Sequence, residues 1–198
     1  MSHAVAVADR PARRHGGHLV LAALAVAAAV AVLATSGRIH PLEARGVAAA
    51  LAPLADGGTA ASGNVAYFGI GTATVHGIQI TPMCSSVVLV VPLLLLSAVL
   101  ALVTRGRRTP RVALALTASV VLVVACNTIR YLGSALALQA WGEQGFDVVH
   151  EYAGSLFVIA GFAAAFLLQL GMTLGRSRPA RGRGRRSAGR EPLPEVAG

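Results

Sequence analysis

The sequence contains few charged residues, few aromatic residues and no lysine. Charged residues make up 13% of the 198 residues, aromatic residues make up 5%, and all 17 basic residues are arginine. With 55% hydrophobic residues and a mean hydropathy of +0.67, the chain is too apolar for an ordinary soluble domain. Because its length leaves room for one compact unit, we expect a single membrane domain with polar ends.

Cysteine is also scarce, since the chain contains only Cys84 and Cys126. Two cysteines far apart in the sequence are too few for a disulfide framework or a zinc site. The sequence has no C-x-x-C motif and no dinucleotide-binding signature. It therefore gives no reason to assign a metal or a cofactor.

Four apolar runs are long enough, or nearly so, to cross a hydrocarbon core of about 30 Å as helices of roughly 17 to 25 residues. They cover residues 19–35, 87–103, 112–129 and 153–174. The first run is short and follows two arginines, so a cleaved signal peptide is an alternative to the uncleaved anchor that we expect. The four runs predict an all-α polytopic membrane protein with about four transmembrane helices.

The arginines predict how these helices are oriented. Three precede the first span, four lie between the second and the third, and seven follow the fourth. Four alternating spans place these 14 arginines on one side of the membrane, and short Arg-rich segments stay on the cytoplasmic side. The remaining three are Arg38, Arg45 and Arg130. We therefore expect a multi-pass plasma-membrane protein with both termini in the cytoplasm.

The chain divides into a basic cytoplasmic N-terminus (1–18), a membrane-embedded domain (19–174) and an Arg-rich tail (175–198). The tail has the Gly, Pro and Arg content of a disordered segment. Its charge is expected to help determine the topology and to bind anionic lipid headgroups. The basic residues follow the membrane pattern, so we expect no nucleic-acid partner.

Two segments after the first span predict structure outside the membrane. Residues 40–58 predict a short Ala-rich helix that begins near Pro41 and ends at Gly57. Residues 64–80 alternate β-branched and small residues and predict a small hairpin. We expect both to form a small extracytoplasmic cap. Residues 131–146 predict a helix lying at the outer surface, with a fifth, tilted or re-entrant segment as the alternative.

Three polar side chains of different chemistry fall at the outer ends of predicted spans. Cys84 precedes the second span, Arg130 follows the third and His150 precedes the fourth. Taken separately, they are typical of a packing thiol, an interfacial anchor and a solvated imidazole. Because the helices of a bundle with short loops pack as neighbours, we expect the three groups to meet on the extracytoplasmic side.

The three groups together have the chemistry for acyl transfer from a peptide bond through a thioester. With Thr81 as the N-cap and Pro82 in the first turn, Cys84 would lie at a helix N-terminus, which favours the thiolate. His150 can accept the thiol proton and return it to a leaving amine. Arg130 stays charged and can stabilise a developing oxyanion.

The residues around these groups resemble a known family. The Cys-Ser-Ser that begins at Cys84, "NTIRY" at 127–131 and "HEYAG" at 150–154 are similar, in order and topology, to motifs of the exosortase/archaeosortase family of membrane transpeptidases. The resemblance covers residues 43–174. It implies a cysteine protease or transpeptidase that cleaves C-terminal sorting signals of exported proteins, each consisting of a short motif, a hydrophobic helix and a basic tail.

The resemblance also implies a role for each residue. Cys84 would be the nucleophile, Arg130 the electrostatic stabiliser and His150 the acid and base. Asn127, one helical turn before Arg130, matches a family asparagine that would position the guanidinium. Ser86 stands where many members have glycine, and fewer spans precede the catalytic half, so the chain resembles a compact, actinobacterial-like type. The acyl acceptor, an amine, another surface group or water, stays open.

Two other functions stay open as well. A thiol-redox membrane protein would use Cys84 and Cys126, although Cys126 lies in a Val-rich run where a thiol packs as a small apolar residue. A non-catalytic membrane assembly protein would use its polar groups only for helix contacts. Further outer groups with the chemistry to bind substrate or orient the site, none of which we assign, are His40, His76, Glu43, Asp147 and Glu151.

Overall fold

The computed structural model describes residues 16–104 and 108–175. Most of the predicted basic N-terminus, the predicted Arg-rich tail after Gly175, and two of the loop arginines, Arg105 and Arg107, lie outside the described residues. The predictions made for those segments therefore stay predictions.

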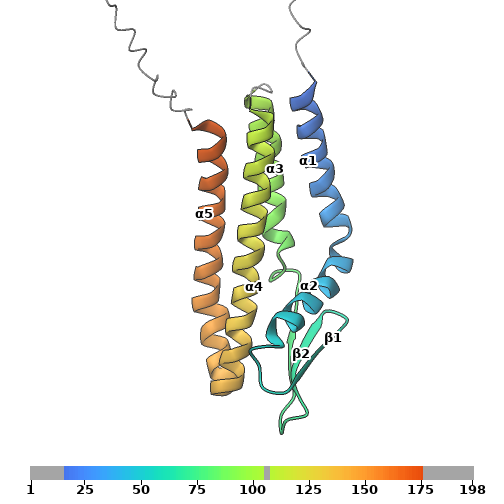
Figure 1. The fold of residues 1–198 in the computed structure, drawn as a ribbon, viewed down its shortest axis with the longest axis vertical. Coiled ribbons are helices and arrows are strands. Elements are labelled where there is room, and N and C mark those ends of the chain that lie inside the picture. The colour runs from blue at the N-terminus through green and yellow to red at the C-terminus, as the bar shows by residue number, and fades with distance from the viewer. Residues whose placement is uncertain (1–15, 105–107, 176–198) are drawn as a thin grey trace, which may run out of the picture.

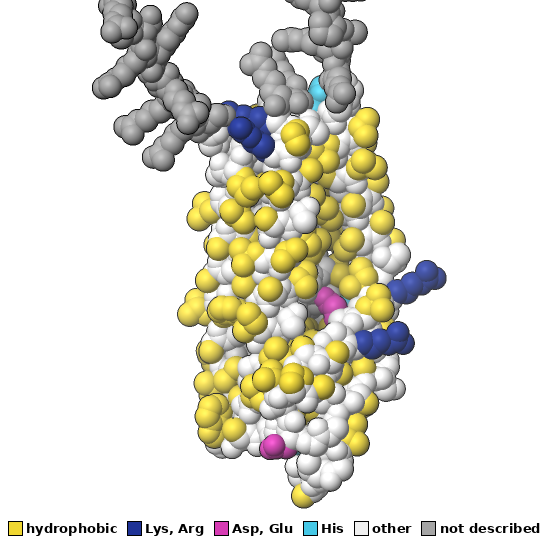
Figure 2. Space-filling model, in the orientation of Figure 1, with side chains coloured by type: hydrophobic (Ala, Val, Ile, Leu, Met, Phe, Trp, Pro, Cys, Tyr) yellow, Lys and Arg dark blue, Asp and Glu magenta, His cyan; other side chains and the backbone are white. Residues whose placement is uncertain are grey.

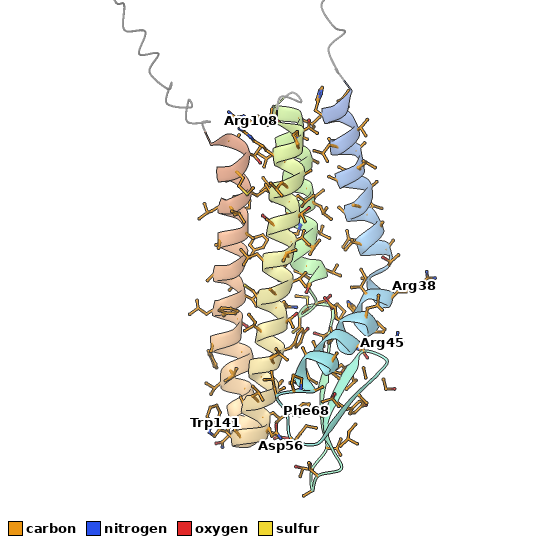
Figure 3. All side chains as sticks on the ribbon, in the orientation of Figure 1. Arg38, Arg45, Asp56, Phe68, Arg108 and Trp141 are labelled. Carbon is orange, nitrogen blue, oxygen red and sulfur yellow. The ribbon has the colours of Figure 1, made fainter. Side chains whose placement is uncertain are left out.

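Four long helices run side by side along the molecule (Figure 1). They are α1 Gly17–Ala34, α3 Val87–Val103, α4 Thr109–Asp147 and α5 Gly154–Leu174. Helices α1 and α4 begin, and helices α3 and α5 end, at the same end of the molecule (Figure 1). Arg108 lies at this end (Figure 3). This alternation of direction is the one that the distribution of arginines predicts.

Small and apolar residues form the contacts between the helices. Helix α1 packs mainly on α3, where Ala22 and Ala25 share a buried cluster with Ala98 and Ala101. Small residues at such positions let helix backbones approach closely. Apolar side chains cover much of the visible outer surface of the long helices (Figure 2), which suits a surface in contact with lipid chains.

Helices occupy all four predicted apolar runs. Among the described residues, α1 and the continuous helical segment Thr109–Leu174 are long and apolar enough to cross a membrane, by length and composition. Helix α3 is also apolar but has 17 residues, the lower limit of the usual length. Four crossings therefore stay a prediction.

Helix α4 corrects the prediction of a separate surface helix at 131–146. The helix that begins at Thr109 continues through this segment to Trp141 and breaks at Gly142, where φ is 68° and ψ is −159°; a short second helix follows to Asp147. The buried residues Tyr131 and Ala135 of the first part pack into the core of the cap, which stabilises the continued helix. The chain turns back at Gly142, because a Cβ at Gly145 would lie 2.9 Å from the carbonyl oxygen of Ala137.

The cap also differs from its prediction. It contains α2 Ser36–Leu51 and a three-stranded antiparallel sheet of β1 Gly58–Ser62, β2 Val65–Ile70 and β3 His76–Gln79, in the order β1-β2-β3. The molecule is therefore helical with a small sheet, not all-α, and α2 begins before Pro41. Phe68, Ile78 and Ile80 are buried together against α2 and α4. The strand that the prediction missed is β1, which pairs with β2, contacts α2 and packs Ala61 against this core. This apolar core joins the cap firmly to α4.

Candidate active site

Cys84 lies in a turn that connects the sheet to α3. The backbone N–H of Cys84 donates to the carbonyl oxygen of Thr81 at 3.1 Å, and α3 begins only at Val87, with Ser86 in the N-cap position. The expectation that Cys84 lies in the first helical turn, capped by Thr81, is therefore wrong. Besides this bond within the turn, side chains of other helices form hydrogen bonds with its backbone. These contacts stabilise the turn in place of a first helical turn.

Two buried side chains of α4 hold the peptide carbonyl of Cys84. Its oxygen accepts a hydrogen bond from Tyr131 Oη at 2.6 Å and another from Asn127 Nδ2 at 2.9 Å. Asn127 Nδ2 also donates to Ser86 Oγ at 3.2 Å. Asn127 thus contacts the turn that carries Cys84, where the resemblance implied that it would position Arg130. Together the two side chains connect the Cys84 turn to α4.

A carboxylate of the cap contacts the same turn. Glu43, on α2, accepts a hydrogen bond from the backbone N–H of Ser86 at 2.8 Å through Oε1. An acidic side chain at this place satisfies one of the unpaired N–H groups at the start of α3 and interacts favourably with the helix dipole. Nothing in the sequence around Glu43 indicated this contact, because it joins residues 43 positions apart.

The thiol and the imidazole face each other. Cys84 Sγ lies 3.6 Å from His150 Nε2, within the distance at which a thiol and a ring nitrogen exchange a proton after small adjustments. Both side chains are only partly buried. The sequence predicted that Cys84 and His150 lie at the same side of the membrane, at the ends of two spans. The structure brings the two side chains into contact.

His150 lies in a short π-helix, η1 Val148–Ala153, between α4 and α5. Such irregular turns are frequent at functional sites. Phe146, one turn earlier, stacks on the imidazole with ring centroids 4.9 Å apart and an interplanar angle of 9°. This contact fixes the plane of the imidazole ring, whose Nε2 faces Cys84.

The guanidinium of Arg130 completes the group. Arg130 Nη2 lies 3.3 Å from His150 Nε2 and donates to the carbonyl oxygen of His150 at 3.2 Å and to Ser155 Oγ at 3.4 Å. Within the described part of the chain no carboxylate pairs with Arg130, and its Nε is buried without a hydrogen-bond partner. The positive charge of the guanidinium is thus not neutralised by an acidic neighbour among the described residues.

A glycine makes room for this arginine. A Cβ at Gly154 would lie 2.7 Å from Arg130 Cγ and 2.7 Å from the carbonyl oxygen of Val149. Any larger residue at this position must displace the arginine or the turn that carries His150. The glycine of the "HEYAG" motif therefore has a steric role in the site.

The other ring nitrogen of His150 contacts a buried serine. Nδ1 lies 3.2 Å from Ser134 Oγ, and this hydroxyl also donates to the carbonyl oxygen of Arg130 at 2.8 Å. Ser134 is fully buried on α4. Sequence reasoning missed it, although its position one helical turn after Arg130 places both residues on the same face of a helix.

Burial and charge affect the basicity of His150, which lies between the predicted spans 112–129 and 153–174. Partial burial and the neighbouring charge of Arg130 lower the pKa of His150 below its usual value of 6.5, and Asp147 opposes this shift. The imidazole is therefore neutral near pH 7 and able to accept a proton.

The second cysteine has a different environment. Cys126 is buried, and its sulfur lies so close to α5 that a Cβ at Gly161 would approach it to 2.6 Å. Both cysteines are free thiols. The contact of Cys126 with Gly161 indicates a packing role between α4 and α5.

Two further sequence candidates have other surroundings. His76 stacks on Phe68 within the sheet, with centroids 5.4 Å apart, and so belongs to the cap. Asp147 acts on His150 only through its charge. In the described ranges, no group of three or more His, Cys, Asp or Glu side chains is arranged to hold a metal ion.

The fold and the site define an apolar helical membrane protein in which a thiol, an imidazole and a guanidinium from three segments are in contact. The family model described as Transmembrane exosortase (Exosortase_EpsH) matches residues 4–168, and the chain belongs to this family. The resemblance noted in the sequence is thereby confirmed. At the level of the family, this means a membrane protein with a transpeptidase-like role in protein sorting. Searches of curated proteins and of solved structures found no match.

Proposed function

We propose that this exosortase is a membrane cysteine transpeptidase that cleaves the C-terminal sorting signals of exported proteins through a thioester on Cys84. The observation that carries the proposal is the 3.6 Å separation of Cys84 Sγ and His150 Nε2. A nucleophile within reach of a base, with a fixed cation beside the base, is an arrangement suited to covalent acyl transfer.

In the first half of the reaction, His150 Nε2 takes the proton of the Cys84 thiol while the sulfur attacks the scissile carbonyl carbon. The negative charge that forms on the carbonyl oxygen is stabilised by the guanidinium of Arg130, which stays charged. The tetrahedral intermediate then breaks its C–N bond, and His150 gives its proton to the leaving amine. The products are a thioester on Cys84 and the released C-terminal fragment.

In the second half, the acceptor attacks the thioester carbonyl carbon. Neutral His150 takes a proton from the acceptor, the C–S bond breaks, and the thiol of Cys84 is regenerated with that proton. An amine or another surface group gives a transferred product, and water gives a hydrolysed one. The neutral state of His150 near pH 7 suits it to both halves of the reaction.

The proposed location is the plasma membrane, with both termini in the cytoplasm and the site on the extracytoplasmic side. Arg108 lies at the end of the bundle opposite to Asp56 and Trp141, near the cap (Figure 3). A cytoplasmic position for Arg108 therefore puts the cap outside the cell. A substrate whose apolar helix lies in the membrane would then present its cleavage motif just above that helix, at the level of Cys84. The proposed partner of the Arg-rich tail is anionic lipid.

The test is mass spectrometry of the mature C-termini of surface proteins in cells that carry this chain or Cys84→Ala at equal membrane abundance. We expect specific proteins to lose a hydrophobic, Arg-ended tail only with the intact thiol. Cys126→Ala is the matched control, and it should process normally. Equal loss of processing in both variants would favour a thiol-redox protein, and identical C-termini in all strains would contradict the proposal.

Arg130→Lys and His150→Gln distinguish an enzyme from an assembly protein. Lysine keeps the charge but loses the planar fork of donors, and glutamine cannot take up a proton. If the protein is an enzyme, both variants should insert into the membrane normally and lose processing. An assembly protein would tolerate both.

A further inference from the structure

Ser134 is the only described side chain that contacts His150 Nδ1, and this contact has a chemical consequence. The two ring nitrogens of a neutral imidazole have opposite roles, since one carries a proton and the other accepts one. Proton transfer from Cys84 requires that Nε2 be the acceptor. The hydrogen bonds around the ring determine which nitrogen carries the proton.

The surroundings of Nε2 identify it as the acceptor. Arg130 Nη2 lies 3.3 Å from Nε2, and a guanidinium can only donate. An N–H group at Nε2 would face this donor, whereas a lone pair at Nε2 accepts from it. The neutral ring therefore carries its proton on Nδ1.

The surroundings of Nδ1 agree with this assignment. The hydroxyl of Ser134 donates its single proton to the carbonyl oxygen of Arg130 at 2.8 Å, so that its oxygen lone pairs are left to accept. Nδ1–H then donates to Ser134 Oγ over 3.2 Å. The chain of hydrogen bonds runs from the imidazole through Ser134 to the backbone of α4, and every donor has an acceptor.

We propose that Ser134 is a positioning residue that holds His150 in the Nδ1–H form, which leaves Nε2 unprotonated on the side of the ring that faces both Arg130 and Cys84. This inference rests on the proposed function. Ser134 is 0% exposed, so water cannot readily replace its hydroxyl. Phe146 stacks on the ring and keeps it from turning to find another acceptor. Ser134 thus has the place that an orienting third group has beside other catalytic histidines.

Removing the hydroxyl leaves Nδ1–H without a partner. A buried donor without an acceptor is unfavourable, which shifts the ring toward the form with its proton on Nε2. That form has its single N–H on Nε2, the atom that faces both Cys84 and Arg130, and so Nε2 cannot take the thiol proton. The titratable and charged groups that face His150 are Cys84, Arg130 and Asp147, and all three remain in the variant.

The experiment measures alkylation of Cys84 by iodoacetamide between pH 6 and pH 10, in the full chain purified in lipid nanodiscs. A Cys126→Ala background leaves one thiol. We expect Ser134→Ala to slow alkylation roughly 3- to 10-fold at pH 7, the value of about one hydrogen bond. The difference should shrink toward pH 10, where hydroxide competes with His150 as the base.

Two variants complete this experiment. Ser134→Thr keeps the hydroxyl and should restore the rate. Ser119→Ala is the matched control, because Ser119 is also buried on α4 and donates to the carbonyl oxygen of Ala165 on α5. It lies 15 residues before Ser134, about 22 Å along the helix, and should leave the rate unchanged. A general loss of packing would instead change the rate at every pH.

The ¹⁵N chemical shifts of the imidazole nitrogens in the unmutated chain give a second, independent measurement. The His150 signals are assigned by their loss in His150→Gln. A protonated Nδ1 at pH 8 supports the inference, and a protonated Nε2 overturns it.

The outcomes separate this inference from the proposed function. If His150→Gln slows alkylation but Ser134→Ala does not, Ser134 has no positioning role and the catalytic pair remains. If His150→Gln leaves alkylation of Cys84 unchanged at pH 7, the catalytic pair itself fails, and the ¹⁵N shifts still decide which nitrogen carries the proton.

Discussion

The hydroxyl of Tyr131 lies 2.6 Å from the carbonyl oxygen of Cys84, so that the peptide group of the proposed nucleophile is bound to the same helix that carries Arg130. Asn127 donates to the same oxygen from one turn earlier. The turn that holds Cys84 has no regular secondary structure of its own. Its position relative to His150 therefore depends on these two contacts and on that of Glu43.

Tyr131→Phe should separate this anchoring from simple packing. The ring is fully buried and stays in place, while the carbonyl oxygen of Cys84 loses its shortest hydrogen bond. We expect a loss of about 1 to 2 kcal/mol in the free energy of unfolding and a fall in processing of about tenfold. Thermal unfolding measures the stability, and cleavage of a peptide substrate that carries a C-terminal sorting signal measures the processing.

The control for this variant is Tyr67→Phe, in the sheet of the cap, where the hydroxyl makes no hydrogen bond with the described residues. Tyr67→Phe should change neither the free energy of unfolding nor the processing. Equal effects of the two substitutions would contradict a specific role for Tyr131.

Gly154→Ala should displace the guanidinium of Arg130. The added Cβ would lie 2.7 Å from Arg130 Cγ, and such overpacking costs about 1 to 3 kcal/mol. Since a misplaced oxyanion donor lowers the rate of acyl transfer by roughly 100- to 1,000-fold, we expect near-complete loss of processing with normal membrane insertion.

Gly171→Ala on the same helix provides the comparison, because no atom lies within 4 Å of a Cβ built there. It should process at the normal rate. If Gly154→Ala also processes normally, the arginine has room that the structure does not show, and its placement in the site is wrong.

Glu43→Ala should loosen the junction between the cap and α3. The carboxylate accepts from the N–H of Ser86 at 2.8 Å, and the loss of a charged acceptor costs about 1.5 to 3 kcal/mol. Glu43→Gln retains an acceptor oxygen and should lose less than half as much. Urea unfolding of the purified protein measures both, with the exposed Glu151→Ala as the reference. A larger loss in Glu43→Gln than in Glu43→Ala would count against the contact.

The pH dependence of cleavage should reflect the lowered pKa of His150. The imidazole works as a base in its neutral form, which persists above its pKa, so that activity is kept at neutral pH and is lost only as the pH falls through the lowered pKa of His150. Asp147→Asn removes a charge that raises this pKa and should shift the acidic limb to still lower pH. A rate profile of both proteins between pH 4 and pH 8 measures the shift. A shift of the limb to higher pH in Asp147→Asn would contradict the role given to this carboxylate.

The sequence by itself determined where the long helices lie and which three side chains form the candidate site. Helix α3 coincides with the predicted run 87–103, and the ends of α1 and α5 differ from prediction by one or two residues. The prediction of the helix positions succeeds because a long apolar run is a local signal that depends on no distant partner. The order of Cys84, Arg130 and His150 along the chain was also sufficient to indicate the family.

Only the tertiary structure decided how these groups are held. Asn127 donates to the turn that carries Cys84, Ser134 contacts Nδ1 of His150, and Glu43 accepts from the N–H of Ser86. Likewise the helix that begins at Thr109 continues past Arg130 as far as Trp141, with Tyr131 buried in the core of the cap. These contacts join residues far apart in the chain, and their energies depend on packing, which no local pattern of hydrophobicity or helix propensity contains.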